Sequence, residues 1–200
     1  MGLKQSHAIF LSAGVPDPAK PHFVGEADTA AISAVVSALL FVVLGRRPIV
    51  WGGHPAITPM IWAFAEGLGV DYSKWVTLYQ SAIFEDYFPE ENARFANVIV
   101  TENVNDNINE SLNLMRRRML SEHQFDAAVF AGGMAGLYDE YDLVRELAPD
   151  AQILPIVSTG GAAEKLGADL RVERDLVTDL DYVSLFFRRL SISPEQSRGK

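Results

Sequence analysis

The chain has 200 residues, of which 48% are hydrophobic, and its formal net charge is −9. This length and apolar content suit one domain with a sizeable core, and the negative charge argues against a nucleic-acid partner because duplex binding uses clustered Lys and Arg. The chain has no cysteine, which excludes disulfides, thiolate catalysis and zinc–cysteine sites.

The first 14 residues lack the long apolar core and the cleavage site of a secretory signal, so we expect a cytoplasmic protein. The uncharged segment Thr29–Gly45 raises the question of a membrane span. Its marginal length and its two serines, Ser33 and Ser37, favour a buried helix or an oligomer interface instead. We therefore expect no membrane partner and a homo-oligomer, a dimer or larger.

Short, continuously apolar runs alternate with helical patterns along the chain. Runs of this kind suit strands that are covered on both faces, as in a parallel sheet. The predicted fold is therefore a single α/β domain with a Rossmann-like open sheet, mainly parallel, and helices on both faces, spanning residues 1–190. The polar residues 191–200 are expected to form a disordered tail. The predicted strands cover 8–13, 48–53, 75–81, 96–101, 126–133 and 151–161, and the predicted helices cover 27–45, 56–68, 105–121, 137–147, 161–167 and 179–189.

The strand ends carry small, Gly-rich or hydroxyl-bearing residues, and residues 81–92 are expected to form a surface loop over a site. In an open parallel sheet, ligands bind outside the carboxyl ends of the strands. Glycines at a strand-to-helix turn let backbone N–H groups approach an anion, although such a turn can also serve backbone geometry alone. Because three such turns share one predicted edge, we expect a phosphate or ribose site there. The candidate ligand-binding residues are Ser12, Gly14, Gly52, Gly53, His54, Gln80, Ser81, Gly132, Gly133, Met134, Gly136, Ser158, Thr159, Gly160 and Gly161.

Charged candidates lie beside these turns. His54 precedes Pro55, a residue favoured at the first helical position, so His54 is expected at the helix mouth, where it contacts a ligand or caps its own turn. Asp139 and Glu140 follow the glycines by about one helical turn, near a bound ribose or on a solvated acidic face. Three consecutive arginines, 116–118, spread over about 200° of a helix, so at least one is expected to point inward. The histidines show no spacing suited to a metal, and neither a metal site nor a cofactor is expected.

These motifs resemble those of the SLOG superfamily, the Rossmann-like group that contains LOG-type nucleoside monophosphate phosphoribohydrolases and DNA-processing A proteins. LOG enzymes carry an Arg on a helix, then a strand, then Pro-Gly-Gly-x-Gly-Thr-x-x-Glu, and the Arg and Glu work at the glycosidic bond. The stretch "MRRRMLSEHQFDAAVFAGGMAGLYDE" is similar in order and spacing. The resemblance matches Arg116 or Arg117 to the Arg, Gly132 and Gly133 to the glycine pair, Gly136 to the next glycine and Glu140 to the Glu.

The chain departs from that pattern in three ways. Ala131 stands for the Pro, one residue is inserted before Gly136, and Leu137 replaces the Thr whose hydroxyl helps to hold phosphate. The "GGHP" and "GGM" turns look more like the SLOG branch that occurs as the sensor half of Thoeris-type bacterial defence effectors, where such domains bind ADP-ribose-derived signals.

Three hypotheses follow. The favoured one is a small-molecule binding domain for a nucleotide-derived ligand of the ADP-ribose or NAD type, with phosphates on the glycine turns, Glu140 at the ribose and Gln80 and Ser81 at a base or hydroxyl. The alternative enzyme is a nucleotide N-glycosidic hydrolase that uses Glu140 and Arg116 or Arg117. The third is a non-catalytic assembly subunit that associates through the apolar helix at 29–45 or through Phe186 and Phe187.

Overall fold

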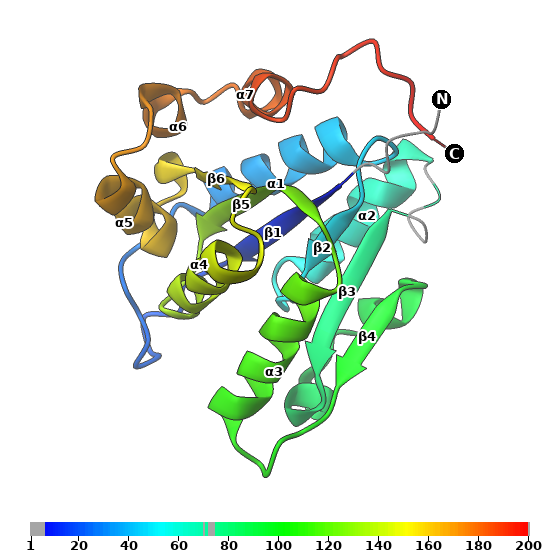
Figure 1. The fold of residues 1–200 in the computed structure, drawn as a ribbon, viewed down its shortest axis with the longest axis vertical. Coiled ribbons are helices and arrows are strands. Elements are labelled where there is room, and N and C mark those ends of the chain that lie inside the picture. Colours follow the sequence, from blue (N-terminus) through cyan, green and yellow to red (C-terminus); the bar gives the residue numbers. More distant parts are fainter. Residues whose placement is uncertain (1–6, 70, 72–74, 200) are drawn as a thin grey trace.

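The computed structural model describes residues 7–69, 71 and 75–199. Its centre is a six-stranded sheet in which every pairing is parallel, with the strand order β4-β3-β2-β1-β5-β6 (Figure 1). The predicted α/β fold with a Rossmann-like sheet is confirmed, and the sheet is entirely rather than mainly parallel. The strands are β1 (Ala8–Gly14), β2 (Ile49–Trp51), β3 (Val76–Ser81), β4 (Val98–Thr101), β5 (Phe125–Gly132) and β6 (Gln152–Pro155).

The central strands are apolar along their length because both faces of the sheet are covered. In β1, Ile9 and Leu11 belong to one hydrophobic cluster, whereas Ala8 and Phe10 belong to another. Helices α1 (Thr29–Val43), α2 (Thr58–Leu68) and α7 (Tyr182–Arg189) contribute to the first cluster. Helices α3 (Ile108–Ser121), α4 (Gly136–Leu147) and α5 (Gly161–Leu170) contribute to the second.

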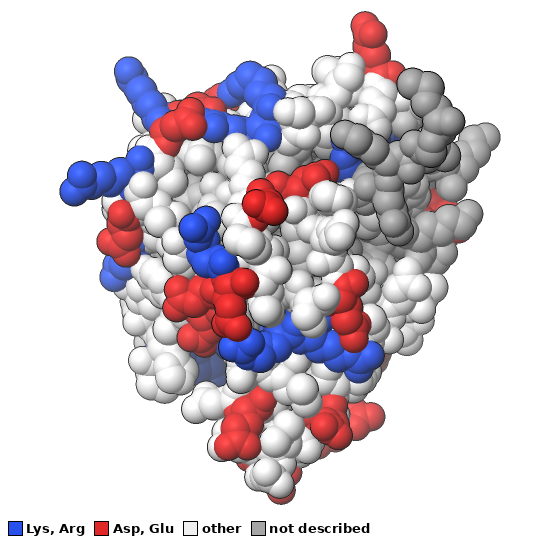
Figure 2. Space-filling model, in the orientation of Figure 1, with Lys and Arg blue, Asp and Glu red and all other residues white. Residues whose placement is uncertain are grey.

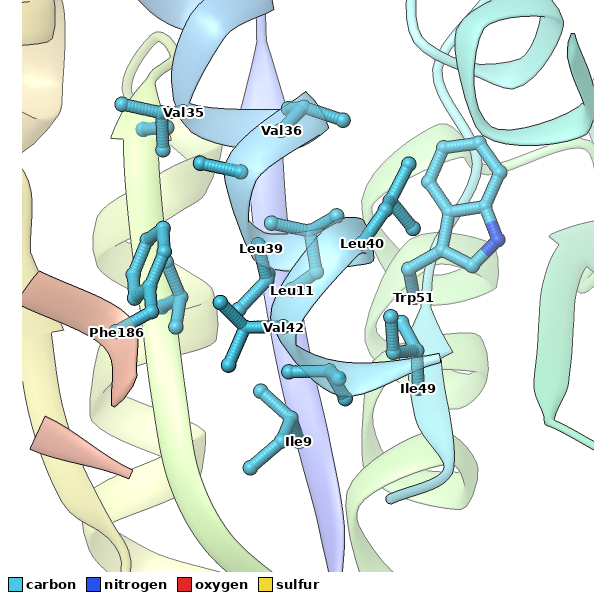
Figure 3. Close-up of a cluster of buried hydrophobic side chains, with 14 of the residues drawn as sticks. Ile9, Leu11, Val35, Val36, Leu39, Leu40, Val42, Ile49, Trp51 and Phe186 are labelled. Carbon is cyan, nitrogen blue, oxygen red and sulfur yellow. The ribbon is translucent and has the colours of Figure 1, made fainter. Parts of the chain in front are cut away.

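Helix α1 is apolar on most sides because other elements of the same chain surround it. Asp28 caps its N-terminus by accepting from the amides of Ala30 and Ala31. Its side chains pack on Ile9, Leu11 and Ile49 of the sheet and on Phe186 of α7 (Figure 3). Packing within one chain thus accounts for the apolar pattern that had suggested an oligomer interface, and Phe186 is fully buried in the same contact.

None of the helices in the described ranges is long and apolar enough to cross a membrane.

Several parts of the chain differ from the predicted elements. The segment 81–92 folds largely into two short 3-10 helices, η2 (Ala82–Tyr87) and η3 (Glu90–Arg94), and a third, η4 (Val157–Thr159), follows β6. A short helix, α6 (Arg174–Thr178), was missed because five residues carry too little periodicity. Residues 191–199, expected to be a disordered tail, lie against the C-terminal end of α1, where the guanidinium of Arg46 donates to the carbonyl of Gln196 at 2.7 Å.

The strand order decides where a ligand crevice can form. From β1 the chain moves outward through β2, β3 and β4, and it then returns to place β5 and β6 on the other side of β1. The order therefore reverses between β1 and β5, and crevices in open α/β sheets lie outside the carboxyl ends of the strands at such a point.

Candidate ligand site

A cavity of about 210 Å³ opens where the strand order reverses. Its lining comes from the ends of β1, β2 and β5 and from the facing sides of α3 and α4. We call it the polar lobe. It is lined by Leu11, Ser12, Ala13, Gly14, Val15, Trp51, Gly52, Gly53, His54, Leu112, Met115, Arg116, Gly133, Met134, Gly136, Leu137 and Glu140.

The turns after β1, β2 and β5 meet at the centre of this lobe. The amide of Gly133 donates to the carbonyl of Gly14 at 2.8 Å. A Cβ added to Gly14 would lie 3.5 Å from Nε2 of His54 and 3.7 Å from Cα of Gly133. Three turns that are distant in sequence thus converge on one small space.

His54 both caps its own turn and faces the polar lobe. The amide of Ala56 donates to its Nδ1 at 3.2 Å, so the neutral ring carries its proton on Nε2, where it is available as a donor. Burial lowers the pKa of His54 below its usual value, which favours this neutral form. Helix α2 begins at Thr58, so His54 lies one turn ahead of it, and Pro59 rather than Pro55 occupies the first turn of the helix. The expectation that Pro55 holds the first helical position is therefore wrong, but His54 lies beside the start of the helix, where its carbonyl accepts from the amide of Thr58 at 2.9 Å.

Of the three consecutive arginines, Arg116 is the one that points into the site. Its Nε lies 3.3 Å from Oε1 of Glu140, and its Nη1 lies 2.9 Å from Oδ2 of Asp139. The side chains of Arg116 and Glu140 are 12% and 17% exposed, whereas that of Asp139 is 66% exposed. A Cβ on Gly136 would lie 2.6 Å from Nη2 of Arg116, so the missing side chain makes room for the guanidinium.

Arg117 and Arg118 lie outside the crevice. Arg117 pairs with Glu146 through both terminal guanidinium nitrogens, Nη1 and Nη2, and Arg118 pairs with Glu122, four residues further along the chain. Figure 2 shows basic and acidic groups interleaved over α3 and α4. Between the two arginines that the sequence could not distinguish, the structure places Arg116 beside Glu140.

A second cavity, of about 450 Å³, continues from the polar lobe past the turn at Gly52–His54. Gln80 and Ser81, at the end of β3, lie on one side, and the segment expected to fold over the site supplies aromatic rings. We call it the aromatic lobe. It is lined by Lys20, His22, Gly52, Gly53, His54, Pro55, Gln80, Ser81, Phe84, Tyr87, Phe88, Pro89, Leu112, Met115 and Met134.

The turn at Ser158–Gly161 lines neither lobe. Thr159 Oγ1 accepts from the amide of Gly132 at 2.9 Å and donates to the carbonyl of Ile156 at 2.6 Å. The amide of Gly161 donates to the carbonyl of Glu26, and Ser158 bonds Tyr182. The polar groups of this turn therefore bind the protein itself, and Gly132 lies behind the crevice with them.

Sequence reasoning missed several lining residues. Leu112 and Met115 lie on the same side of α3 as Arg116, because residues three and four apart share a helix face, and that spacing was a usable signal. Lys20 and His22 reach the aromatic lobe from the long connection between β1 and α1, and no local pattern marks them.

The parallel sheet with its crevice at the reversal point defines a Rossmann-like α/β domain. Residues 22–190 match the model of the SLOG cluster3 family, and the chain belongs to that family. This membership suggests a nucleotide-related ligand or a LOG-like function. No curated protein matches the chain significantly.

Proposed function

We propose that the chain binds a nucleotide-derived ligand of the ADP-ribose or NAD type across the polar and aromatic lobes. The observation that carries this proposal is the convergence of Gly14, His54 and Gly133 beside the pair formed by Arg116 and Glu140, all on one cavity. Family membership and the position at the strand-order reversal support it independently. The resemblance of the "GGHP" and "GGM" turns to the sensor branch, whose domains bind ADP-ribose-derived signals, is a further reason for proposing a ligand of this type.

Local charge suggests how such a ligand lies. Arg116 bears one positive charge, and Asp139 and Glu140 bear two negative charges, so this group carries a net −1 and repels a phosphate. Glu140 is therefore assigned to ribose hydroxyls. The phosphates are assigned to the start of α4, where the amides of Met134 and Gly136 have no partner among the described residues, together with Nε2–H of His54.

The test compares two neighbouring arginines. ADP-ribose, NAD and AMP are titrated into the wild type and into Arg116→Met and Arg117→Met, and both affinity and melting temperature are measured. A ligand at 100 times its Kd stabilises the folded state by about 2.7 kcal/mol. We expect Arg116→Met to weaken binding about tenfold or more, because it leaves Glu140 without its cation inside the crevice.

Arg117→Met serves as the matched control, because Arg117 pairs with Glu146 outside both lobes. Its affinity is expected to change less than about twofold. The proposal is wrong if none of the three ligands binds, or if the two variants weaken binding equally.

A second candidate function is hydrolysis of a nucleotide N-glycosidic bond, favoured by the contact of Glu140 with Arg116 inside the cavity. In this reading, Glu140 acts as the base or stabilises the developing cation at the anomeric carbon. Incubation with AMP and with NAD would release free base, and Glu140→Gln would abolish the release while Glu146→Gln would not. Ligand-dependent stabilisation without base release favours binding alone.

We further propose that the protein is cytoplasmic, has no nucleic-acid partner and forms a homo-oligomer. Light scattering across a concentration series tests the oligomer. A mass equal to that of the monomer at every concentration would show that the proposed homo-oligomer is wrong.

A further inference from the structure

The aromatic lobe differs in chemistry from the polar lobe. Among its described lining residues there is no carboxylate, and Phe84, Tyr87, Phe88 and Pro89 supply rings from one segment. Lys20 and His22 are exposed at its rim. A charged group placed here would lose water without gaining a buried counterion, whereas a flat, uncharged ring would gain aromatic contacts.

One buried polar atom in this lobe lacks a partner. Ser81 is 1% exposed, and its Oγ has no hydrogen bond in the described part of the chain. Buried hydroxyls are normally hydrogen-bonded, so a residue that lines a cavity and has an unpaired hydroxyl is a candidate to bond an atom of a ligand. Gln80, beside it, is 8% exposed, and its carboxamide lies directly against the backbone of Gly53, where any Cβ would collide with it.

A hydroxyl and a carboxamide supply both donors and acceptors without charge. Aromatic rings together with a few uncharged polar groups are what a flat heterocycle requires: contact on its surface and hydrogen bonds at its edge. A purely apolar ligand would leave Ser81 Oγ unpaired. The turn at Gly52–His54 borders both lobes, so a single ligand can occupy the two together.

We propose that the aromatic lobe binds the nucleobase of the ligand, with Ser81 Oγ hydrogen-bonded to the edge of the base and Phe84 and Phe88 packed against it. This inference rests on the proposed function and assigns one end of the ligand within it. Tyr87, whose exposure is 77%, lies at the same lobe and becomes partly covered when the base is bound.

The experiment compares AMP with ribose 5-phosphate, which lacks the base, by calorimetric titration of the full chain. In the wild type, AMP binds at least tenfold more tightly than ribose 5-phosphate. Ser81→Ala weakens the affinity for AMP about fivefold and leaves the affinity for ribose 5-phosphate unchanged. Because the hydroxyl has no protein partner among the described residues, we expect this variant to keep the melting temperature of the wild type.

Ser111→Ala is the matched control. Ser111 is also buried, but its Oγ accepts from the amide of Val104 at 2.9 Å, and Ser111 lines neither lobe. This variant lowers the melting temperature and leaves the preference for AMP intact. Phe88→Ala, a second probe of the lobe, reduces the preference for AMP as Ser81→Ala does.

Two failures are distinguishable. If ribose 5-phosphate binds and AMP binds no more tightly, or if Ser81→Ala weakens both ligands equally, the base assignment is wrong while the proposed function stands. If neither ligand binds, and ADP-ribose and NAD fail as well, the proposed function and the base assignment fall together.

Discussion

The turn after β5 and the turn after β6 look alike in sequence, since each places a glycine pair before a helix, yet they serve different purposes. At the first, residues 132–136, the amides of Met134 and Gly136 have no partner among the described residues, and the turn faces the crevice. At the second, residues 158–161, the amide of Gly161 and the hydroxyl of Thr159 bind the protein. The first turn is therefore the better candidate site, because those two of its amides stay without a partner among the described residues, although the amides of Gly132, Gly133 and Ala135 donate within the protein.

The two turns also depend on each other. Thr159 Oγ1 accepts from the amide of Gly132, and the carbonyl of Gly133 accepts from the amide of Ala162. The turn after β6 thus holds the crevice turn in place from behind. Substitutions in the rear turn should therefore cost stability, whereas Gly136→Ala in the front turn, where the backbone is not left-handed, should cost binding.

The largest expected effect is that of Gly161→Ala on stability. Gly161 has a φ of +63°, and a Cβ there would lie 2.8 Å from the carbonyl oxygen of Gly133. Left-handed backbone and a clash with backbone atoms together should lower the free energy of unfolding by about 2–4 kcal/mol. Urea denaturation measures it.

Gly67→Ala is the control for this substitution, because Gly67 lies in α2 and, apart from the backbone of its own helix, no atom of the described residues is within 4 Å of its added Cβ. The control should be neutral or up to about 1 kcal/mol more stable. Equal stability of the two variants would contradict the structural role given to the rear turn.

Thr159→Val should have the next largest effect. The substitution keeps the shape of the side chain but removes the acceptor for the buried amide of Gly132, which should cost about 1–3 kcal/mol. Thermal or chemical unfolding measures the difference. Thr178→Val on exposed α6 is the control and should stay within about 0.5 kcal/mol of the wild type. A loss no greater than that of the control would show that the hydroxyl does not support the crevice turn.

Gly136→Ala should weaken ligand binding while leaving the stability of the fold nearly unchanged, the opposite of the two substitutions in the rear turn. Among the described residues outside its own helix, the added Cβ meets only the guanidinium of Arg116, the far end of a flexible side chain, so the free energy of unfolding should change by less than about 1 kcal/mol. Displacing the guanidinium should nevertheless weaken AMP about tenfold, a loss of about 1.4 kcal/mol. AMP is titrated into this variant and into Gly67→Ala. Equal affinities of the two variants for AMP would show that Arg116 does not contribute to binding.

The smallest effect concerns pH. Burial lowers the pKa of His54 below its usual value of 6.5, so between the folded-state pKa and 6.5 the unfolded chain binds more protons than the folded one. The corresponding stability is present above pH 6.5 and is lost as the pH falls below it. His123, whose pKa burial also lowers, acts in the same direction. Melting temperatures between pH 7.5 and 5 should therefore fall less steeply for His54→Gln than for the wild type, and parallel profiles would contradict the role of burial at His54.

Much of the fold could be predicted because its signals are local. Continuous apolar runs marked all six strands, and the period of the helical segments marked the six longer helices within a few residues. The short α6 and the 3-10 helices could not be predicted, because one or two turns carry no measurable period. At the site, the glycines, His54 and Glu140 could be named as candidates, but whether Arg116 or Arg117 faces Glu140 could not, since adjacent residues on a helix differ by about 100° and only the placement of α4 decides between them.

The sequence by itself determined the layered architecture. The spacing of its apolar residues predicts strands that are buried on both faces and helices that are buried on one side. Only the tertiary structure decided which glycine turn opens onto the crevice and which is bound internally. That decision depends on pairing between distant strands, which places β5 against β1 and brings Gly133 to Gly14. Hydrogen bonds between residues so far apart in the chain produce no periodic pattern in the sequence of either segment. Two glycine pairs that look alike in sequence therefore have different roles.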